Sequence, residues 1–241
     1  MKTIKSFFSA GKRPIILESR EAYKLWSQSY DDEKNNLILY YDEIILKKLL
    51  FEINLNGKTL LDFGSGTGRN WKEYSNYNTG RIIGCDTSPE MINKLKNKYP
   101  NAETYLITKG DFNFLHAKEC DIIISTLVIS HINDLKKLIF EWNRVMKDSG
   151  DIIITDFHPD LFEKGGGRTF KHSGNTYKIV NYIHKIREME ELFSSFGYHR
   201  VSLIEEIIDE HVKSFYLKKN ALHIYEKFKG IPFIYGLHLS R

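Results

Sequence analysis

From residue 59 onward, short apolar runs alternate with segments whose apolar positions recur every three or four residues. The short runs are rich in Ile and Leu, a composition typical of strands buried on both faces of a parallel sheet. Helical segments lie between most of them, and this alternation predicts a doubly wound α/β fold with helices on both faces of the sheet. The five predicted strands are Thr59–Phe63, Arg81–Cys85, Glu103–Ile107, Asp121–Ser125 and Asp151–Thr155.

Capping residues mark the start of two predicted helices. Ser88 is followed by Pro89 and Glu90, which supply an N-cap, a residue favoured at the first helical position and an acid suited to the helix dipole. A second helix follows Asp134 and is expected to end before Gly150. Its predicted apolar face comprises Leu135, Leu138, Ile139, Trp142, Val145 and Met146.

Beyond the fifth strand the alternation is interrupted. Residues 157–180 include the run Gly165-Gly166-Gly167, so we interpret them as a mobile excursion at the carboxyl end of the sheet. Such a loop could order on a bound substrate, and the alternative is a surface loop without ligand contact. A helix over residues 186–196, a strand near Val201–Ile207, a further helix and a last apolar segment at Ile231–Leu239 complete the pattern.

The first part of the chain has helical periodicity instead of short apolar runs. Apolar residues between Ser19 and Ile53 recur at helical spacing, which predicts an amphipathic helix ahead of the first strand. We therefore expect an N-terminal helical cap or lid over residues 1–54 and a single α/β domain over residues 55–241.

Composition narrows the class of protein. The 35 Lys and Arg residues exceed the 31 Asp and Glu residues only slightly and are spread along the chain, which makes a nucleic-acid partner unlikely. No apolar run reaches the roughly 18 residues that a membrane span requires, and no secretory signal is recognisable. Two cysteines, expected near opposite ends of the strands, do not make a disulfide framework, so we expect a reduced, cytoplasmic protein.

The strongest chemical signal is the glycine-rich turn after the first strand. Gly64, Gly66 and Gly68 follow a buried strand that carries Asp62, and a helix is expected to begin at about Arg69. Glycine lets the backbone turn sharply and lets a ligand approach closely, while the following helix offers free N–H groups to a carboxylate. Three glycines alone are weak evidence, but their place between a strand and a helix indicates a cofactor site.

Two further acids follow the next two strands. Asp86 ends the second strand, 22 residues beyond Gly64, where an acid can accept hydrogen bonds from both ribose hydroxyls of a nucleoside. Its alternative role, capping the next helix, is already filled by Ser88. Asp111 follows the third strand in a Gly-Asp turn and could accept from an exocyclic adenine amine. Three such features at three successive strand ends favour a nucleoside-containing cofactor.

In these stretches the sequence resembles the class I S-adenosylmethionine-dependent methyltransferases, in the branch that includes quinone-biosynthesis and natural-product enzymes. The resemblance covers about Tyr23 to Gly197, and the matching stretches are LLDFGSGTGR, IIGCDTSPEMI, KGDF, CDIIISTLVISHIND and EWNRVMKDSGDIII. It implies a Rossmann-like, seven-stranded sheet that is mostly parallel, with an antiparallel last strand supplied by Ile231–Leu239. Many members have Cys or Ala where this chain has Ser65, a common variation.

The resemblance also assigns cofactor-binding roles by position, with S-adenosylmethionine as methyl donor and S-adenosylhomocysteine as product. Gly64, Ser65, Gly66 and Gly68 would line the methionine moiety, with Asp62 and Arg69 at the ends of this loop. Asp86 and Thr87 would hold the ribose, Asp111 and Phe112 the adenine, and Ser125 and Thr126 would flank the cofactor. Tyr23, Trp26 and Tyr30 resemble an aromatic lid, with Tyr30 the best candidate for cofactor contact; the alternative is an aromatic helix face packed on the domain.

Two histidines are the candidate general bases. His131 and His158 both follow strand ends on the edge that carries the glycine loop, and imidazole titrates near neutral pH. His131 could instead only support a helix start. A metal site is not expected, because the histidines and cysteines lack short paired spacings.

The sequence as a whole predicts an enzyme that transfers a methyl group to an O or N nucleophile of a small-molecule biosynthetic intermediate. Two alternatives stay open: a methyltransferase acting on RNA or a peptide or protein, and a non-catalytic S-adenosylmethionine-binding partner of another enzyme. A nicotinamide dehydrogenase fits less well, because its glycines usually follow the longer G-x-G-x-x-G spacing. The acceptor and the oligomeric state are not determined by the sequence.

Overall fold

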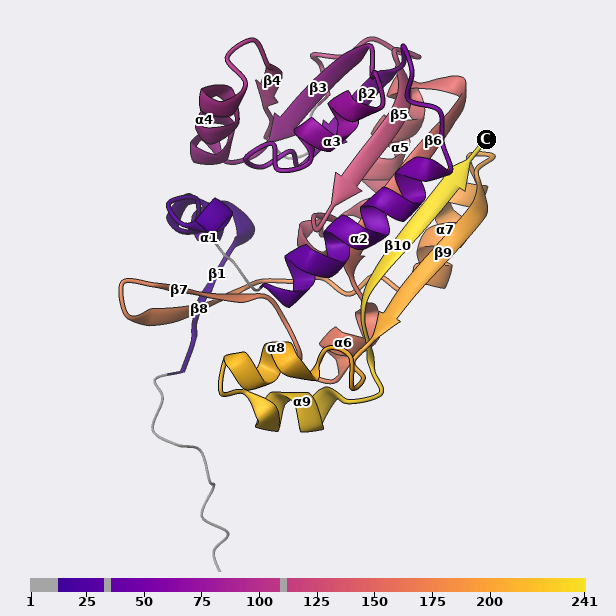
Figure 1. The fold of residues 1–241 in the computed structure, drawn as a ribbon. Helices are drawn as coiled ribbons and strands as arrows, with labels where there is room; N and C mark the ends of the chain where they lie inside the picture. Colours follow the sequence, from indigo (N-terminus) through magenta and orange to yellow (C-terminus); the bar gives the residue numbers. More distant parts are fainter. Residues whose placement is uncertain (1–12, 33–35, 109–111) are drawn as a thin grey trace, which may run out of the picture.

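The structure is a computed structural model that describes residues 13–32, 36–108 and 112–241. Its centre is a seven-stranded sheet (Figure 1). In spatial order the strands are β4 (Glu103–Leu106), β3 (Arg81–Asp86), β2 (Thr59–Phe63), β5 (Cys120–Thr126), β6 (Met146–Phe157), β10 (Pro232–Ser240) and β9 (His199–Ile207). The first five are mutually parallel, whereas β10 is antiparallel to both β6 and β9. The predicted Rossmann-like sheet with an antiparallel last strand is confirmed.

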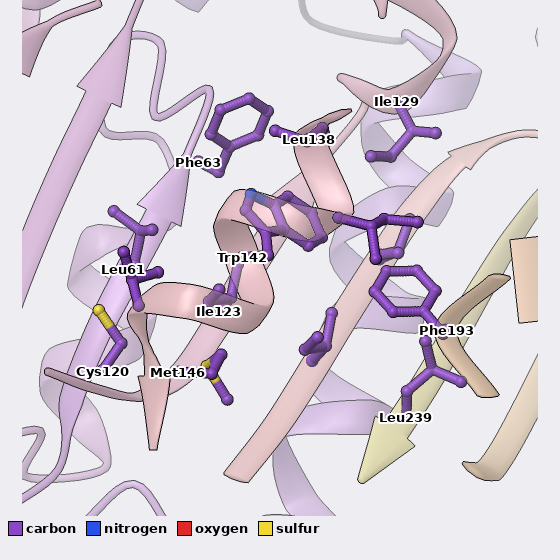
Figure 2. Close-up of a cluster of buried hydrophobic side chains, with 14 of the residues drawn as sticks. Leu61, Phe63, Cys120, Ile123, Ile129, Leu138, Trp142, Met146, Phe193 and Leu239 are labelled. Carbon is purple, nitrogen blue, oxygen red and sulfur yellow. The ribbon is translucent and has the colours of Figure 1, made fainter. Parts of the chain in front are cut away.

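Helices cover both faces of this sheet, because successive residues of a buried strand point to opposite sides. Leu60 packs in the core beneath α2 (Leu37–Phe51), α3 (Trp71–Asn76) and α4 (Pro89–Lys98), whereas Leu61 packs beneath α5 (Leu135–Val145) and α7 (Ile186–Ser194). Figure 2 shows the second core, in which the indole of Trp142 lies between Phe63 and Phe193. Two hydrophobic layers therefore hold the strand ends at a fixed edge.

The predicted helix after Asp134 is wrong at its carboxyl end. We expected it to continue to just before Gly150, with Met146 on its apolar face, but α5 ends at Val145 and Met146 begins β6. Met146 has extended backbone angles and pairs with Cys120 of β5. Met146 is buried, as predicted. It belongs to a strand because β5 pairs with it, and local periodicity does not encode that pairing.

A second, three-stranded sheet lies beyond the carboxyl edge and was not predicted. It consists of β1 (Ile15–Leu17), β8 (Asn175–Ile179) and β7 (Thr169–His172), in that order, so it joins the N-terminal segment to the 157–180 excursion. The excursion also contains the short helix α6 (Pro159–Glu163). Much of the segment interpreted as a mobile loop is thus regular structure, and it packs beside α1 (Ser19–Trp26), as Figure 1 shows.

The helical N-terminal region divides into two helices. Between α1 and α2 lies a 3-10 turn at Tyr30–Asp32, and Asn36 caps α2 by accepting from the backbone N–H groups of Ile38 and Leu39. Near the C-terminus, the single expected helix before β10 is a pair, α8 (Lys213–Lys218) and α9 (Leu222–Phe228). None of the helices in the described residues is long and apolar enough to span a membrane. Cys85 and Cys120 are buried free thiols.

One buried ion pair connects α2 to the segment after the glycine loop. Arg69 Nη2 donates to Asp42 Oδ2 at 2.5 Å, and the hydroxyl of Thr155 in β6 donates to the other carboxylate oxygen. The Asp42 side chain is fully buried, whereas that of Arg69 is 23% exposed. The carboxylate therefore fixes α2, the loop and the central sheet relative to one another.

Candidate active site

A cavity of about 550 Å³ lies at the carboxyl edge of the sheet, beneath α1. This is the edge at which ligands bind in open α/β sheets, and the volume falls within the roughly 300–1,000 Å³ of small-molecule sites. The cavity brings together seven of the predicted site residues: Tyr30, Gly64, Gly66, Asp86, Thr87, Thr126 and His131. Tyr23, Phe63, Met91, Ile107, Leu127 and Val128 contribute further surface.

The glycine loop turns through backbone angles that favour glycine. Gly64, Gly66 and Gly68 have φ values of 73°, 54° and 70°. A Cβ on Gly64 would lie 2.3 Å from a methyl carbon of Val128, whereas a Cβ on Gly66 would meet no atom closer than 3.9 Å. Glycine is needed at position 64 because a side chain there would clash with Val128, whereas Gly66 leaves room at the cavity surface for a ligand.

Asp86 holds this loop against the next strand. Its carboxylate accepts from the backbone N–H of Gly66 at 2.9 Å and from that of Ser88 at 2.8 Å. Ser88 itself caps α4 through its hydroxyl, as predicted, by accepting from the Met91 N–H. Burial raises the pKa of Asp86, and the backbone hydrogen bonds oppose that shift. A carboxylate fixed in this way at the cavity surface can still accept from the two vicinal hydroxyls of a ribose.

Other predicted cofactor residues lie around the cavity without lining it. Asp62 is buried and accepts from the Trp71 indole at 2.8 Å; burial raises its pKa to about 7. Arg69 pairs with Asp42, and Phe112 stacks on Phe63 at 5.6 Å between ring centroids. Ser65, Gly68 and Ser125 are also absent from the lining, and Asp111 lies outside the described residues. Asp62, Arg69 and Phe112 thus support the loop and its surroundings from outside the cavity.

Two buried hydroxyls beside the loop have no hydrogen-bond partner, Ser65 Oγ and Ser125 Oγ. Buried polar atoms without partners are uncommon in folded proteins and concentrate where a ligand or water completes the network. Neither hydroxyl lines the cavity, so the fit to S-adenosylmethionine rests on the open surface at Gly66 and on the Asp86 carboxylate. The apolar side chains of Met91 and Ile107 offer contact to a base.

The two histidines differ sharply in their surroundings. His131 lines the cavity: its Nε2 lies 3.1 Å from the Tyr23 hydroxyl and its Nδ1 lies 3.3 Å from the Val180 carbonyl oxygen. Burial, and then the nearby positive charge of Arg168, lowers the pKa of His131 to about 3, so the imidazole is neutral. With the proton on Nδ1, which donates to Val180, Nε2 accepts from Tyr23.

His158 does not line this cavity. Its Nδ1 accepts from the Asp160 N–H at 3.2 Å and caps α6, while its Nε2 lies 2.7 Å from a carboxylate oxygen of Glu205. Both ring nitrogens are thus engaged away from the glycine loop. Of the two predicted bases, only His131 is placed for a role next to a ligand.

Sequence reasoning missed Arg168 and placed Tyr23 in the aromatic lid without singling it out for cavity contact. Arg168 is 4% exposed and its guanidinium lies 4.9 Å from the Trp26 ring centroid and 5.5 Å from that of Tyr23. The helical spacing of the α1 aromatics could have indicated Tyr23, because Trp26 and Tyr30 lie on the same face. Nothing in the glycine-rich sequence around Arg168 indicates a buried cation. Among the described residues, no group of acidic, His or Cys side chains could hold a metal ion.

The glycine pair Gly66 and Gly57 gives a direct test of the loop. Both have positive φ, and neither has an atom closer than 3.9 Å to an added Cβ, but only Gly66 lines the cavity. Replacement by Ala should destabilise either variant by about 1–2 kcal/mol through backbone strain. Only Gly66→Ala should also weaken S-adenosylhomocysteine binding, by at least about tenfold, because its methyl group occupies ligand space. Equal affinities of the two variants by calorimetry would contradict the placement of the cofactor at Gly66.

Comparison with known proteins agrees with this geometry. Residues 61–154 match the family model described as a methyltransferase domain. Over 215 residues the chain is 25% identical to an uncharacterised methyltransferase of Emericella nidulans, covering 74% of each chain. It is 31% identical over 137 residues to an uncharacterised protein of Methanocaldococcus jannaschii, covering 56% of this chain and 50% of that protein.

Solved structures share the fold at low identity. An S-adenosylmethionine-dependent methyltransferase from Mesorhizobium loti superposes with a TM-score of 0.62 at 12% identity, covering 81% of this chain and 96% of its own. DhpI in complex with S-adenosylhomocysteine gives a TM-score of 0.61 at 17% identity, covering 92% and 93%. Residues 61–154 form a methyltransferase domain, and the sheet order, glycine loop and acid-tipped second strand agree with the fold of S-adenosylmethionine-dependent methyltransferases. The chain is an enzyme with this domain, and S-adenosylmethionine is its cofactor.

Proposed function

We propose that the enzyme methylates an O or N nucleophile of a small-molecule biosynthetic intermediate. The observation that carries this proposal is the cavity itself, which runs from the glycine loop to His131 and is covered by α1. Much of the catalysis of methyl transfer is proximity, and holding two groups in a near-attack arrangement can supply roughly 7–11 kcal/mol. A covered cavity suits an acceptor small enough to enter it.

The names of two similar proteins support a small acceptor. The chain is 31% identical over 114 residues to a ubiquinone/menaquinone biosynthesis C-methyltransferase of Campylobacter jejuni, covering 44% of this chain and 47% of that enzyme. A Haemonchus contortus phosphoethanolamine N-methyltransferase, in complex with phosphomonomethylethanolamine, has the same fold with a TM-score of 0.59 at 15% identity. Both names refer to small acceptors, although they differ in the atom methylated.

A macromolecular acceptor is the second candidate. One solved structure of this fold is the partner of the Trm112 methyltransferase activator in a Haloferax volcanii complex, with a TM-score of 0.63 and 15% identity. Such an enzyme would need an exposed binding surface around the cavity mouth, where this chain instead has the cover formed by α1. We therefore favour the small acceptor.

Bound S-adenosylmethionine supplies an electrophilic methyl group on a sulfonium. The chain's own residues then position the acceptor. The neutral Tyr23 hydroxyl donates to His131 Nε2, which leaves its oxygen lone pairs free to accept an N–H or O–H from the acceptor. Because burial also raises the pKa of Tyr23, the phenol stays protonated. The low pKa of His131 disfavours complete proton transfer to it, so the pair orients the nucleophile and an amine acceptor enters in its neutral form.

His131→Asn and His158→Asn distinguish the two histidines. We expect His131→Asn to lower kcat by about 10- to 100-fold, the cost of a poorly oriented nucleophile, without changing S-adenosylhomocysteine affinity. His158→Asn should retain near-normal kcat, since Asn can still cap α6. The kcat–pH profile of the unmodified enzyme should show no His131 inflection near 6.5, because that imidazole titrates at about 3.

The experiment that tests the whole proposal follows directly. Calorimetry with S-adenosylhomocysteine establishes cofactor binding, and release of this product is then measured with a panel of small amines, phenols and acids beside RNA and peptide substrates. Turnover confined to small acceptors supports the proposal. Turnover only with RNA or peptides would replace it by the second candidate, and cofactor binding without any turnover would favour a non-catalytic partner protein.

A further inference from the structure

A second cavity, of about 290 Å³, lies on the other side of the wall formed by Tyr30, Leu127 and Arg168. It is an open pocket bordered by the start of α2, the residues before β7, and helices α8 and α9. Its surface is largely apolar and aromatic, with Trp26, Phe157, Phe215, Tyr216, Phe228 and Phe233 among the contributors. The only charged side chains among its described lining residues are Arg168 and Lys219, and both are cationic.

Arg168 is a buried cation that interacts electrostatically with the buried carboxylate of Asp156 but forms no ion pair with it. Its Nη1 donates to the Leu127 carbonyl and its Nη2 to the Tyr30 hydroxyl, both at the long distance of 3.4 Å, and no carboxylate within residues 13–32, 36–108 or 112–241 forms an ion pair with it. The faces of Trp26, Tyr23 and Phe157 surround the guanidinium at 4.9–5.8 Å. By contrast, the other partly buried arginine of this region, Arg69, is paired with Asp42.

Burying a charge is costly unless it is paired and hydrogen-bonded. Cation–π contacts and two long hydrogen bonds offset only part of this cost. A guanidinium also presents its donors in a planar fork that matches a carboxylate or phosphate. A site of this kind is completed by an oxyanion that arrives with a ligand.

The position of Arg168 ties this second cavity to the methyl-transfer site. Tyr30 and Leu127, its two hydrogen-bond partners, both line the first cavity, so an oxyanion on the guanidinium would lie within one layer of side chains of the bound methyl donor. Leu127 has a φ of 59°, an uncommon backbone conformation for a branched residue, and its carbonyl points at the guanidinium. Strained residues persist mostly where the surrounding structure has a functional use for them.

We propose that the second cavity binds an amphipathic oxyanion: an acyl or aryl group held by the aromatic walls, with a carboxylate or phosphate on Arg168. This inference goes beyond the proposed function, because the wall formed by Tyr30, Leu127 and Arg168 separates this ligand from the methyl donor.

The test uses the full-length enzyme and decanoate as probe, with 1-decanol and decylamine as matched neutral and cationic chains. In calorimetric titrations, with and without saturating S-adenosylhomocysteine, we expect decanoate to bind at least tenfold more tightly than either analogue. Arg168→Met should lower decanoate affinity by about 10- to 100-fold while leaving S-adenosylhomocysteine affinity unchanged. Arg187→Met, at an arginine whose side chain is 89% exposed, is the control and should change neither affinity.

A second variant tests the cavity without touching the charge. Ala221 lines the cavity and begins the turn into α9, so Ala221→Phe should fill the space and reduce decanoate binding while the thermal unfolding midpoint shows that the chain is folded. Equal binding of the three chains, or decanoate binding that survives both variants, would overturn the proposal. So would an Arg168→Met variant that loses S-adenosylhomocysteine and keeps decanoate, since Arg168 would then serve the cofactor through Tyr30. Failure of the unmodified enzyme to bind S-adenosylhomocysteine would instead contradict the proposed function.

Discussion

Replacing Asp86 by Ala should lower the affinity for S-adenosylhomocysteine by at least about 100-fold. A hydrogen bond to a charged group contributes about 1.5–3 kcal/mol, and a ribose offers two hydroxyls to this one carboxylate. The variant also removes the acceptor for the Gly66 and Ser88 N–H groups, so the glycine loop loses its attachment to the next strand. Calorimetric titration with S-adenosylhomocysteine, with NADH in parallel, measures the effect.

Two further variants make this result specific. Asp86→Asn keeps one acceptor oxygen but no charge, so its affinity should lie between those of Asp86→Ala and the unmodified enzyme. Asp148→Ala removes an acid whose side chain is 80% exposed, and its affinity should be unchanged. Thermal unfolding shows whether each variant is folded; a folded Asp86→Ala protein with normal affinity would remove Asp86 from the ribose role.

Asp42→Ala should lower the free energy of unfolding by about 3–5 kcal/mol, the usual cost of removing one partner of a buried ion pair. The change leaves the Arg69 guanidinium without its carboxylate and the Thr155 hydroxyl without its acceptor. Urea unfolding monitored by circular dichroism gives the free energy. Because the pair fixes the segment that follows the glycine loop, cofactor affinity should fall as well.

The neighbouring residue supplies the control. Glu43 also lies on α2 and pairs with Lys47 at 2.7 Å, but both side chains are about half exposed, so Glu43→Ala should cost less than about 1 kcal/mol. The double variant Asp42→Ala/Arg69→Met should cost less than the sum of its single changes, because each single change strands a buried charge. Additive effects would mean that the two residues do not stabilise each other.

Much of the sheet could be predicted because buried parallel strands carry their own signature. The runs at Thr59–Phe63 and Arg81–Cys85 were located to within one residue of β2 and β3, since continuous Ile- and Leu-rich runs between turn residues have few other interpretations. Ser88 was found as a cap, and a helix was expected directly after Asp134, because helix-start signals act on backbone groups two or three residues away. Signals this local need no tertiary information.

Elements whose identity depends on distant partners were predicted less well. Met146 begins a strand only because Cys120 lies beside it, and β1 forms only because β8 offers it an edge. Both pairings join residues far apart in the sequence, so no window along the chain contains them. The 157–180 excursion shows the same limit: its glycines suggested mobility, and the pairing of β7, β8 and β1, which gives much of it regular structure, could not be predicted.

The sequence by itself indicated a nucleoside-containing cofactor and the strand edge at which the site lies, because the glycine loop and Asp86 act through the backbone immediately around them. Its resemblance to S-adenosylmethionine-dependent methyltransferases indicated the class of enzyme. Only the tertiary structure decided which side chains reach the cavity. It placed His131 at the cavity and His158 away from it, and it paired Asp62 with Trp71 and Arg69 with Asp42. It also brought Tyr23 and Arg168 beside the site. Burial, charge pairing and cavity shape arise from contacts between remote segments, and local patterns carry no record of them.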